Sequence, residues 1–414
     1  MSHYPPIVAL EIGTTKVAVA VGEKQSDGSI LVTGFSREES KGVRKGEIID
    51  VDTAQAGVRR ALTAAEEGAQ VDIERVCLAV SGSHIRSEHH QAAIPITSET
   101  GLITEADEVA VTELVKATHF PPDREVLHWI PLHYTIDGER VVPRAAGMEG
   151  SRLELRMLII HGDRKRLHTP AILVRELPLE VESLAFGGLC SALGVLTPEQ
   201  KKEGVLVVDL GGGTTDYLLY ASSTIAHAGS LAIGGDHVTN DISYAFAVST
   251  RSAERLKREH GAALVDMANR LQTLRIPAEL GFQERTVALG ALQTVIHERM
   301  DELFNLIKKR IGDHPRHEIR AGVVLTGGGA KLRHVRELAE KIFRLPCTIG
   351  VPTGLDGLTG QLDDPEFATV AGLIKYGDFL ARRQEEGFWT RFWRRFASWG
   401  RRAASGPAIE ENGG

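Results

Sequence analysis

The sequence predicts an α/β protein made of two halves of similar plan that face each other across a cleft. Residues 7–21 read as an apolar strand ending on Glu11, a Gly-Thr-Thr turn and a second apolar strand. Residues 204–219 repeat this order, with Asp209 at the strand end and three glycines in the turn. A third apolar strand leads into three more glycines within residues 322–329. Unbroken aliphatic and β-branched runs of this kind suit strands that are covered on both faces.

The two hairpins contain the residue types that hold phosphate groups. Glycines let backbone N–H groups approach an anion closely, and threonines add hydroxyl donors. The residues concerned are Gly13, Thr14 and Thr15 in the first hairpin, and Gly211, Gly212, Gly213 and Thr214 in the second. Paired hairpins could clamp a polyphosphate from opposite sides, with the third loop, Gly327, Gly328 and Gly329, beside the nucleoside. Asp209 is placed to hold the water shell of Mg²⁺. The alternative is a set of glycine-rich turns that bind nothing.

Composition and charge narrow the function classes. The 414 residues suffice for two or three domains. A net charge of -7 argues against general nucleic-acid binding. No apolar run reaches the roughly 18 residues of a membrane span, and no signal peptide is expected because Glu11 and Lys16 interrupt the only early apolar stretch. Three widely separated cysteines without metal spacing favour a reducing compartment: Cys77, Cys190 and Cys347. The pairs His89-His90 and His314/His317 are expected at the surface rather than as metal ligands.

Residues 82–161 read as a small α+β unit inserted into the first half. Thr104 followed by Asp107 resembles a capping box that opens a helix. Alternation from Arg152 to Ile159 predicts a half-exposed strand. Ser81 and Ser83 stand near a histidine, but no base, orienting acid and elbow motif accompany them, so a nucleophile is not expected.

Residues 238–318 read as a second, largely helical insert. Glu254 and Lys257, three residues apart, share one helix face. Their spacing would suit contacts to a ribose and purine, although an exposed ion pair is the default interpretation. In the helix over residues 291–311, Arg299 and Arg310 fall in the middle of an apolar face. Either these guanidinium groups pair internally with carboxylates, or the face borders a groove for an acidic peptide.

Residues 387–402 predict an amphipathic helix that lies on a membrane surface. Its aromatic face consists of Phe388, Trp389, Phe392, Trp393, Phe396 and Trp399. Its basic face consists of Arg391, Arg394, Arg395, Arg401 and Arg402. An aromatic face opposite an arginine face is typical of helices bound to anionic lipid. The alternative is a C-terminal helix docked on the protein's own core. Residues 403–414 are expected to be disordered.

These motifs carry a family resemblance. The segments 11–16, 209–216 and 325–330, in this order, resemble the actin/Hsp70/hexokinase superfamily. The segments 45–50, 79–84 and 126–131, with the insert and the tail, are similar to the bacterial cell-division family FtsA. The resemblance implies two actin-like (ribonuclease H-like) domains around a nucleotide cleft, with a small α+β insert in the first half and a C-terminal amphipathic helix.

The resemblance also implies a function. Proteins of this family bind ATP, polymerise into actin-like filaments and hold the FtsZ ring to the cytoplasmic face of the membrane at the division site. Their helical insert in the second half binds the C-terminal peptide of FtsZ, which carries over here to Arg299, Lys308 and Lys309. Residues 82–161 would contact later division proteins. A pilus-assembly scaffold of the PilM type and a small-molecule kinase of the same superfamily remain the alternatives.

Site residues carry over by position. ATP would contact Gly13, Thr14, Thr15, Lys16, Gly211, Gly212, Gly213, Thr214, Glu254, Lys257, Gly327, Gly328 and Gly329. Asp209, with Glu11, would organise Mg²⁺. Many hydrolysing relatives have a Glu at the start of the helix that here begins Gly187-Gly188. No carboxylate stands at this place in the present sequence, so the attacking water would lack a positioned base. We therefore expect firm ATP binding with weak hydrolysis. Residues 377–386 are expected to form a short linker.

The expected domain boundaries follow from these motifs. Residues 1–81 and 164–203 belong to the first half and enclose an inserted SHS2-like domain, 82–163. Residues 204–237 and 319–380 belong to the second half and enclose the helical insert, 238–318. A linker, 381–387, precedes the membrane helix, 388–402, and the disordered tail, 403–414.

Overall fold

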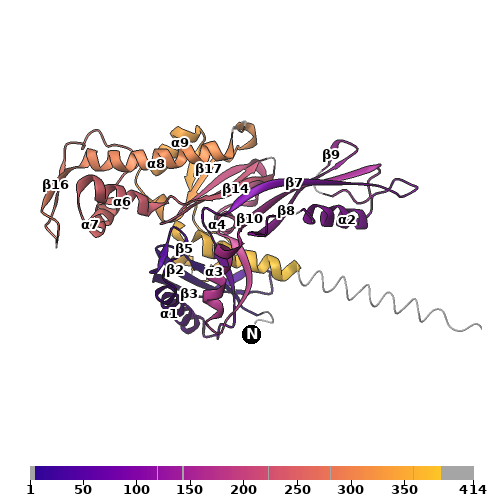
Figure 1. Cartoon of the computed structure of the whole chain (residues 1–414), viewed down its shortest axis with the longest axis horizontal. Helices are drawn as coiled ribbons and strands as arrows, with labels where there is room; N and C mark the ends of the chain where they lie inside the picture. Colours follow the sequence, from indigo (N-terminus) through magenta and orange to yellow (C-terminus); the bar gives the residue numbers. More distant parts are fainter. Residues whose placement is uncertain are drawn as a thin grey trace, which may run out of the picture.

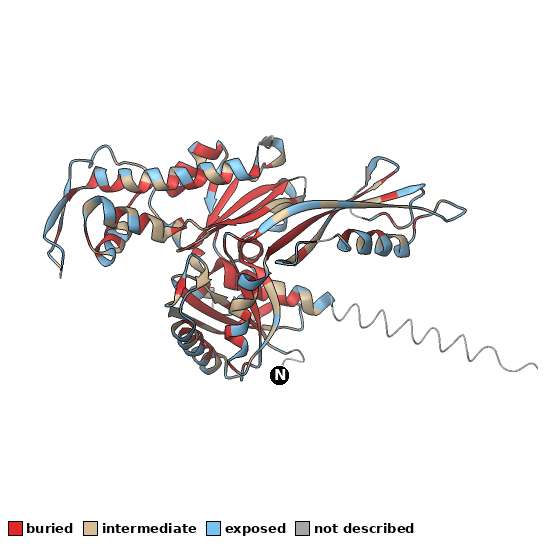
Figure 2. Cartoon of the chain, in the orientation of Figure 1, coloured by how far each residue is buried: buried red, intermediate tan, exposed pale blue. Residues whose placement is uncertain are grey.

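Two β-sheets form the centre of the molecule, one in each half, and a domain extends outward on either side (Figure 1). The computed structural model describes residues 5–383, except for positions 119, 142, 143, 222, 280, 313, 315 and 358. The predicted membrane helix, residues 388–402, and the tail after it lie outside the described residues. Buried residues concentrate in the two sheets and in the helices between them (Figure 2).

The first half contains a six-stranded sheet in the order β11-β6-β1-β2-β3-β19. Its strands are β1 (Ile7–Ile12), β2 (Lys16–Lys24), β3 (Ile30–Glu39), β6 (Arg75–Val80), β11 (Glu180–Phe186) and β19 (Asp356–Gly357). β1, β2 and β3 form an antiparallel meander, and β6 pairs parallel with β1. The helices α1 (Val51–Ala69) and α3 (Arg164–Arg175) share one hydrophobic core with this sheet. Asp50 caps α1, because its carboxylate accepts a hydrogen bond from the Thr53 N–H.

The second half repeats the plan of the first. Its five-stranded sheet has the order β14-β13-β12-β17-β18. The strands are β12 (Val205–Leu210), β13 (Thr215–Ala221), β14 (Thr224–Leu231), β17 (Val323–Thr326) and β18 (Cys347–Ile349). β12, β13 and β14 form the meander, and β17 pairs parallel with β12 as β6 does with β1. The predicted α/β fold with two similar halves is therefore confirmed.

Helices between the two sheets join the halves. α4 (Gly187–Val195) follows β11 and packs against strands of both sheets. α5 (Pro198–Glu203) then leads into β12, and its capping box joins Thr197 with Gln200. A further helix, α9 (Val335–Phe343), does not join the halves; it packs against β17 and β18 of the second sheet. Glycine and small residues dominate α4 because the other elements approach it closely: a Cβ on Gly194 would lie 2.3 Å from the carbonyl oxygen of Ala368.

The first inserted domain consists of a four-stranded sheet and one helix. The sheet has the order β7-β10-β8-β9. The elements are β7 (Arg86–Pro95), α2 (Glu105–Lys116), β8 (Arg124–Ile136), β9 (Glu139–Val141) and β10 (Arg152–Asp163). The predicted capping box of Thr104 and Asp107 is present at the start of α2. β10 alternates as predicted only up to Met157; from Leu158 to Ile160 both of its faces are buried, because this end packs against the second half.

The second inserted region lies at the opposite end of the molecule. Its elements are α6 (Gly235–Phe246), α7 (Thr250–His260), β15 (Thr273–Ile276), β16 (Arg285–Ala288) and α8 (Leu289–Ile311). The buried face of α8 joins the core of the second sheet, with α6 and α9 beside it. The predicted long helix is thus present. Among the described residues, no helix is long and apolar enough to cross a membrane.

The structure corrects the expected boundaries near the C-terminus. The predicted second half extended to residue 380, but β19 pairs with β3 of the first sheet. Residues 368–383 are helical, and Val370, Ala371 and Ile374 pack against Ala9 and Ala18 of the first half. The helix therefore also occupies the beginning of the predicted linker. A two-residue parallel pairing and a helix that returns to a distant sheet leave no local sequence signal.

Candidate nucleotide site between the two halves

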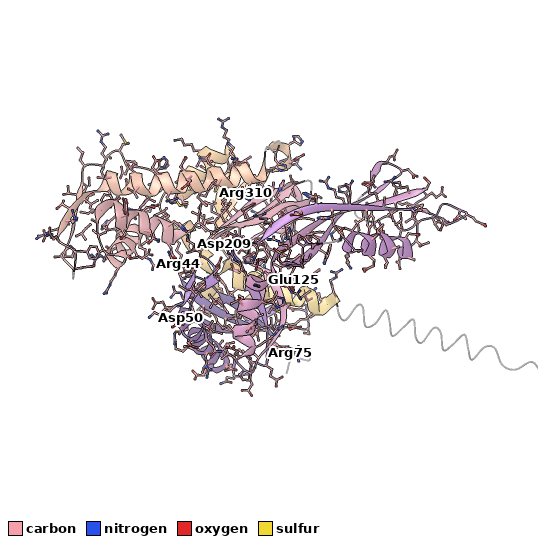
Figure 3. All side chains as sticks on the ribbon, viewed as in Figure 1. Arg44, Asp50, Arg75, Glu125, Asp209 and Arg310 are labelled. Atoms are coloured by element: carbon pink, nitrogen blue, oxygen red, sulfur yellow. The ribbon has the colours of Figure 1, made fainter. Side chains whose placement is uncertain are left out.

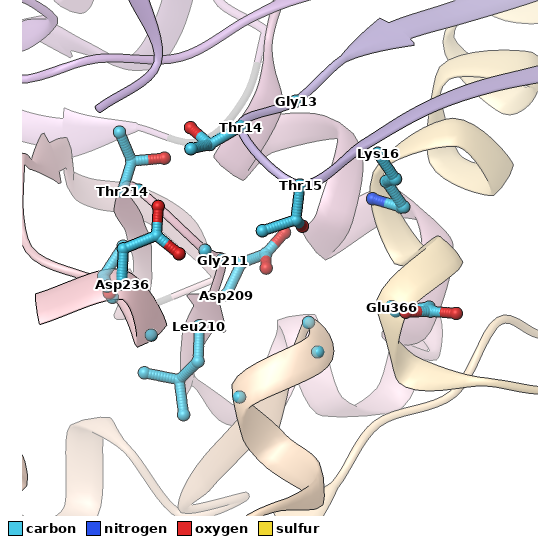
Figure 4. A pocket seen from close by; sticks show the side chains of 18 of the residues that line it. Gly13, Thr14, Thr15, Lys16, Asp209, Leu210, Gly211, Thr214, Asp236 and Glu366 are labelled. Atoms are coloured by element: carbon cyan, nitrogen blue, oxygen red, sulfur yellow. The ribbon is translucent and has the colours of Figure 1, made fainter. Parts of the chain in front are cut away.

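One cavity of about 540 Å³ lies between the halves and brings the predicted nucleotide and metal residues together (Figure 4). Its lining includes every residue predicted to contact ATP or Mg²⁺: Glu11, Gly13, Thr14, Thr15, Lys16, Asp209, Gly211, Gly212, Gly213, Thr214, Glu254, Lys257, Gly327, Gly328 and Gly329. These residues come from seven separate elements or loops and span more than three hundred positions of the sequence. Asp209 lies near the centre of the molecule (Figure 3).

The glycines of the second hairpin are required by the approach of the first. A Cβ on Gly212 would lie 2.4 Å from Cγ2 of Thr15, and a Cβ on Gly213 would lie 2.3 Å from Oγ1 of Thr14. Both distances are too short for a real side chain, so only glycine lets the two turns face each other across this gap. The threonine hydroxyls and the glycine N–H groups therefore border the same space.

Two hydroxyl groups hold the carboxylate of Asp209. Ser191 on α4 donates a hydrogen bond to its Oδ2 over 2.5 Å, and Thr369 donates to the same oxygen over 3.0 Å. Gly327 follows β17 with φ +80, and a Cβ there would lie 2.2 Å from Oδ1 of Asp209. The third glycine loop therefore packs directly on the second hairpin. These contacts fix the orientation of Asp209 at the floor of the cavity.

Glu11 forms a buried ion pair with Lys16. The Nζ of Lys16 lies 2.6 Å from Oε1 of Glu11, and Oε2 has no hydrogen-bond partner. Burial raises the pKa of Glu11, and the charge of Lys16 opposes that shift. The ammonium of Lys16 is therefore already partly neutralised inside the cavity.

Asp216 is a site residue that the sequence analysis missed. It is the register partner of Asp209 across β12 and β13, so both carboxyl groups point into the same region. Ser81 donates a hydrogen bond to its Oδ2 over 2.5 Å, and its Oδ1 has no partner. Burial, followed by the charge of Asp209, raises the pKa of Asp216 to about 7. The sequence feature that could have identified Asp216 is the alternation of residues after the glycine run, which places position 216 on the same face of the sheet as position 209.

The first turn of α4 has no carboxyl group, as expected, but Asp216 of β13 lies beside it. A Cβ on Gly187 would lie 2.2 Å from Oγ of Ser81 and 3.0 Å from Oδ2 of Asp216. Ser81 and Asp216 therefore occupy the space in which a longer side chain at position 187 would stand. The cavity has an acid at this place, supplied by β13 instead of α4. Ser81, considered above as a nucleophile, orients this acid.

Glu254 and Lys257 line the cavity and are also paired with each other. Their Oε2 and Nζ lie 2.6 Å apart, and Thr239 donates to the same oxygen over 2.5 Å. Lys257 also donates to the carbonyl of Gly235 over 3.0 Å. Burial alone would raise the pKa of Glu254, but Lys257, Thr239 and Arg258 together lower it to about 2. The ion pair given as the default interpretation is therefore present, and it lies in the cavity wall; contacts to a ribose and purine stay a prediction.

The residues predicted to bind a partner peptide lie outside the cavity, on α8. Arg299 forms a two-pronged contact with Asp241 of α6, at 2.6 and 3.0 Å, and also pairs with Glu302. Lys308 donates to the carbonyl of Ile342 over 2.9 Å, and Lys309 is exposed. The internal pairing considered for Arg299 is thus present. Arg310, expected on the apolar face, is exposed near the end of the helix (Figure 3).

Three histidines from separate parts of the chain lie close together. His89 and His314 both contact the ring of His227, at centroid distances of 6.0 and 5.6 Å. Among the described residues, no group of three or more His, Cys, Asp or Glu side chains is arranged to hold a metal ion. The three cysteines are buried and free.

Comparison with known proteins identifies the family. A family model for cell division protein FtsA matches residues 206–372, and a model for the SHS2 domain inserted in FtsA matches residues 82–161. Cell division protein FtsA of Pseudomonas aeruginosa is 34% identical over 382 residues, which cover 92% of this chain and 90% of that protein. The chain belongs to the FtsA family. FtsA of Escherichia coli K12 is also 34% identical and covers 90% of both chains.

Solved structures confirm the fold of this FtsA family member. A chain from the PilM-PilN type IV pilus biogenesis complex aligns with a TM-score of 0.63 at 17% identity, covering 90% of this chain and 98% of that one. MreB5 of Spiroplasma citri bound to ADP aligns with a TM-score of 0.55 at 16% identity, covering 92% and 98%. At such identities the likeness establishes the actin-like fold alone.

Proposed function

We propose that this FtsA family member binds ATP with Mg²⁺ in the cavity between its halves, forms actin-like filaments and tethers the FtsZ ring to the cytoplasmic membrane. Nucleotide binding is supported by the convergence of three glycine-containing loops on one cavity of about 540 Å³; two of these loops are the hairpins that also carry threonines. That volume suits a cofactor-sized ligand. MreB5, which shares the fold, is described in complexes with ADP and with AMPPNP.

The residues present fit a magnesium ion carried by phosphate groups. Mg²⁺ keeps several waters and needs only one or two carboxylates in such sites. Asp209 lines the cavity, and Ser191 and Thr369 orient its carboxylate through Oδ2. Glu11 is less well suited, because Lys16 occupies one of its oxygens and burial raises its pKa. When bound, the ion would neutralise phosphate charge; Asp209 would hold its water shell.

Hydrolysis is proposed to be weak. A general base acts when it is ionised and within reach of the attacking water, and it contributes roughly 10²- to 10⁴-fold to a rate. Asp216 is the acid beside the start of α4, but its Oδ2 already accepts a hydrogen bond from Ser81, and the first turn of α4 itself has no carboxyl group. A turnover rate comparable to that of a metabolic kinase would contradict the proposal.

Nucleotide binding is tested by titration calorimetry of the full chain with ATP and ADP in the presence and absence of Mg²⁺. We expect saturable binding that strengthens with Mg²⁺. The unaltered chain is compared with Asp209→Asn, a variant that keeps the shape of the side chain but removes the charge that would hold the water shell. It should lose most of the Mg²⁺ dependence. No heat above dilution for the unaltered chain would overturn nucleotide binding.

Membrane attachment rests on the composition of residues 388–402, whose aromatic and arginine faces are segregated. A single helix of this size should bind reversibly, and filament formation should multiply its residence. The test is sedimentation of the full chain and of a chain ending at Glu386 with vesicles that contain anionic lipid. We expect only the full chain to pellet. Equal pelleting of the two would contradict the tether and favour a fold relative without it, such as a pilus-assembly scaffold.

FtsZ binding is tested by co-pelleting this chain with FtsZ filaments that carry or lack the FtsZ C-terminal peptide. Arg299, Lys308 and Lys309 on α8 are the proposed contacts for that peptide. We expect recruitment to depend on the peptide. Recruitment that is independent of the peptide, or absent, would remove the FtsZ tether from the proposal while leaving nucleotide binding intact.

A further inference from the structure

A third hairpin reaches the phosphate side of the cavity. β4 (Val43–Arg44) and β5 (Glu47–Ile48) are joined by Lys45 and Gly46, whose φ angles are 54° and 75°. Two consecutive residues with positive φ form the tight turn that matches the twist of paired strands. Gly46 and Ile48 line the cavity. The sequence analysis used residues 45–50 only as a sign of family resemblance and gave them no role.

The tip of this hairpin contacts both phosphate hairpins at once. The N–H of Gly46 donates to Oγ1 of Thr14 over 3.1 Å. A Cβ on Gly213 would lie 2.8 Å from the backbone N and Cα of Lys45. A Cβ on Gly46 would lie 3.0 Å from Cγ2 of Thr214. Because Thr14 accepts the hydrogen bond from Gly46, its own hydroxyl hydrogen remains available to a ligand.

An ion pair anchors the hairpin to the first half. Glu47 pairs with Nη1 of Arg166 on α3 over 2.8 Å. Arg166 also lines the cavity. The hairpin whose tip contacts Thr14 and Gly213 is therefore also tied to α3.

Each lysine and arginine that lines the cavity already has a partner in the described chain, whereas Lys45, which is exposed and stands next to the lining residue Gly46, has no carboxylate partner there. Lys16 pairs with Glu11, Lys257 and Arg258 with Glu254, Arg166 with Glu47, Arg37 with Glu366 and Lys331 with Asp364. Arg333 donates to the carbonyl of Gly261. Among the described residues, no carboxylate lies within 4.0 Å of the Lys45 ammonium. Burial and then the charge of Lys45 lower the pKa of His237, in the first turn of α6 beside the cavity residues Gly234 and Gly235.

We propose that the hairpin Val43–Ile48 is a third phosphate-binding element and that Lys45 binds the terminal phosphate of a nucleoside triphosphate. Lys45 then sets a preference for triphosphate over diphosphate, because it is a cation beside the lining residue Gly46 whose charge no carboxylate of the described chain neutralises. A triphosphate brings one more phosphate group and more negative charge than a diphosphate, and a charge-assisted hydrogen bond to that group is a strong one. This inference rests on the proposed nucleotide binding.

The test compares the affinities of full-length variants for a non-hydrolysable ATP analogue and for ADP, both with Mg²⁺, by titration calorimetry. Lys45→Gln removes the charge and keeps an unbranched side chain at the positive φ, so the turn is not strained further. We expect it to weaken binding of the triphosphate analogue about tenfold and binding of ADP less than about twofold. Lys45→Arg keeps a cation and should retain most of the preference.

Lys41→Gln is the matched control. Lys41 lies four positions before Lys45, is exposed and pairs with Glu39, so its loss changes the net charge equally without touching the cavity. It should leave both affinities unchanged. An unchanged triphosphate preference in Lys45→Gln, or an equal loss for both nucleotides, would overturn this inference alone. Absence of nucleotide binding by the unaltered chain would overturn the proposed function and this inference with it.

Discussion

The hydroxyl of Ser81 donates a hydrogen bond to Oδ2 of Asp216 over 2.5 Å, although 135 positions separate the two residues. Ser81 is the residue before Gly82, where the first inserted domain begins, and Asp216 follows the second glycine loop. The bond therefore joins the border of an inserted domain to an acid in the cavity. Gly187 makes this contact possible, because any side chain at its position would collide with Ser81.

The raised pKa of Asp216 predicts a pH-dependent stability. Its carboxyl group titrates near 3.8 when the chain is unfolded and near 7 when it is folded. The folded state therefore binds the proton more tightly, and this stabilisation, complete below pH 4, is lost as pH rises through 7. Between pH 5 and 8 the group should cost the folded protein about 2 to 3 kcal/mol.

Chemical denaturation of wild type and Asp216→Asn at several pH values measures this effect. The Asn variant cannot ionise, so its free energy of unfolding relative to wild type should rise from pH 5 to about pH 7 and level off above that. A difference between the two proteins that stays constant over this range would show that Asp216 titrates at an ordinary value.

The hydroxyl pair at Asp209 predicts a cooperative network. Ser191→Ala and Thr369→Val each remove one donor to the same buried oxygen, and each should lower the free energy of unfolding by about 1 to 2 kcal/mol. Ser191 and Thr369 also contact each other at 2.9 Å, so the double variant should lose less than the sum of the two. Thr169→Val on α3 is the control, because its hydroxyl bonds only to the exposed helix backbone at Lys165. Strict additivity would argue against a shared network.

The close approach of the two phosphate hairpins predicts that Gly213 tolerates no side chain. In Gly213→Ala the new methyl group would meet both Thr14 and Lys45, so the halves would have to separate there. We expect a loss of about 1 to 3 kcal/mol in stability and a clear loss of nucleotide affinity. Gly360→Ala in α10 (Thr359–Leu362) is the control, because no atom lies within 4 Å of the added Cβ. Wild-type affinity in Gly213→Ala would show that the hairpins lie farther apart in solution.

The pairing of Arg299 predicts opposite effects for two substitutions. Asp241→Asn removes the carboxylate that occupies the guanidinium and should strengthen the proposed binding of the FtsZ C-terminal peptide. Arg299→Gln should weaken it. Fluorescence anisotropy of a labelled peptide measures both. If the two substitutions weaken binding alike, Arg299 acts by holding α8 to α6 and does not contact the peptide.

The local features of this fold could be predicted from the sequence. A strand that ends on an acid, a glycine turn and a second strand are consecutive residues, so both hairpins were found at the right positions. The capping box of Thr104 and Asp107 depends on four consecutive residues and was found for the same reason. Repetition of the hairpin then implied two halves, and the halves implied the cavity between them.

Features that depend on distant contacts could not be predicted. β19 joins β3 through two residue pairs, and those residues lie more than three hundred positions apart. The partner of Arg299 is 58 positions away, and the sequence analysis could state only that a carboxylate was required. Lys45 was missed because a Lys-Gly turn has no signature of its own. Its position becomes meaningful only when Thr14 and Gly213 are placed beside it.

The first inserted domain leaves the first half at Gly82 and returns to it at Asp163, yet Leu158 and Ile160 pack into the core of the second half with Leu218 and Tyr220. The inner end of this domain therefore touches both halves, and its outer end carries α2, away from the two central sheets (Figure 1). A substitution at Leu158 or Ile160 would disturb the inserted domain and the core of the second half together.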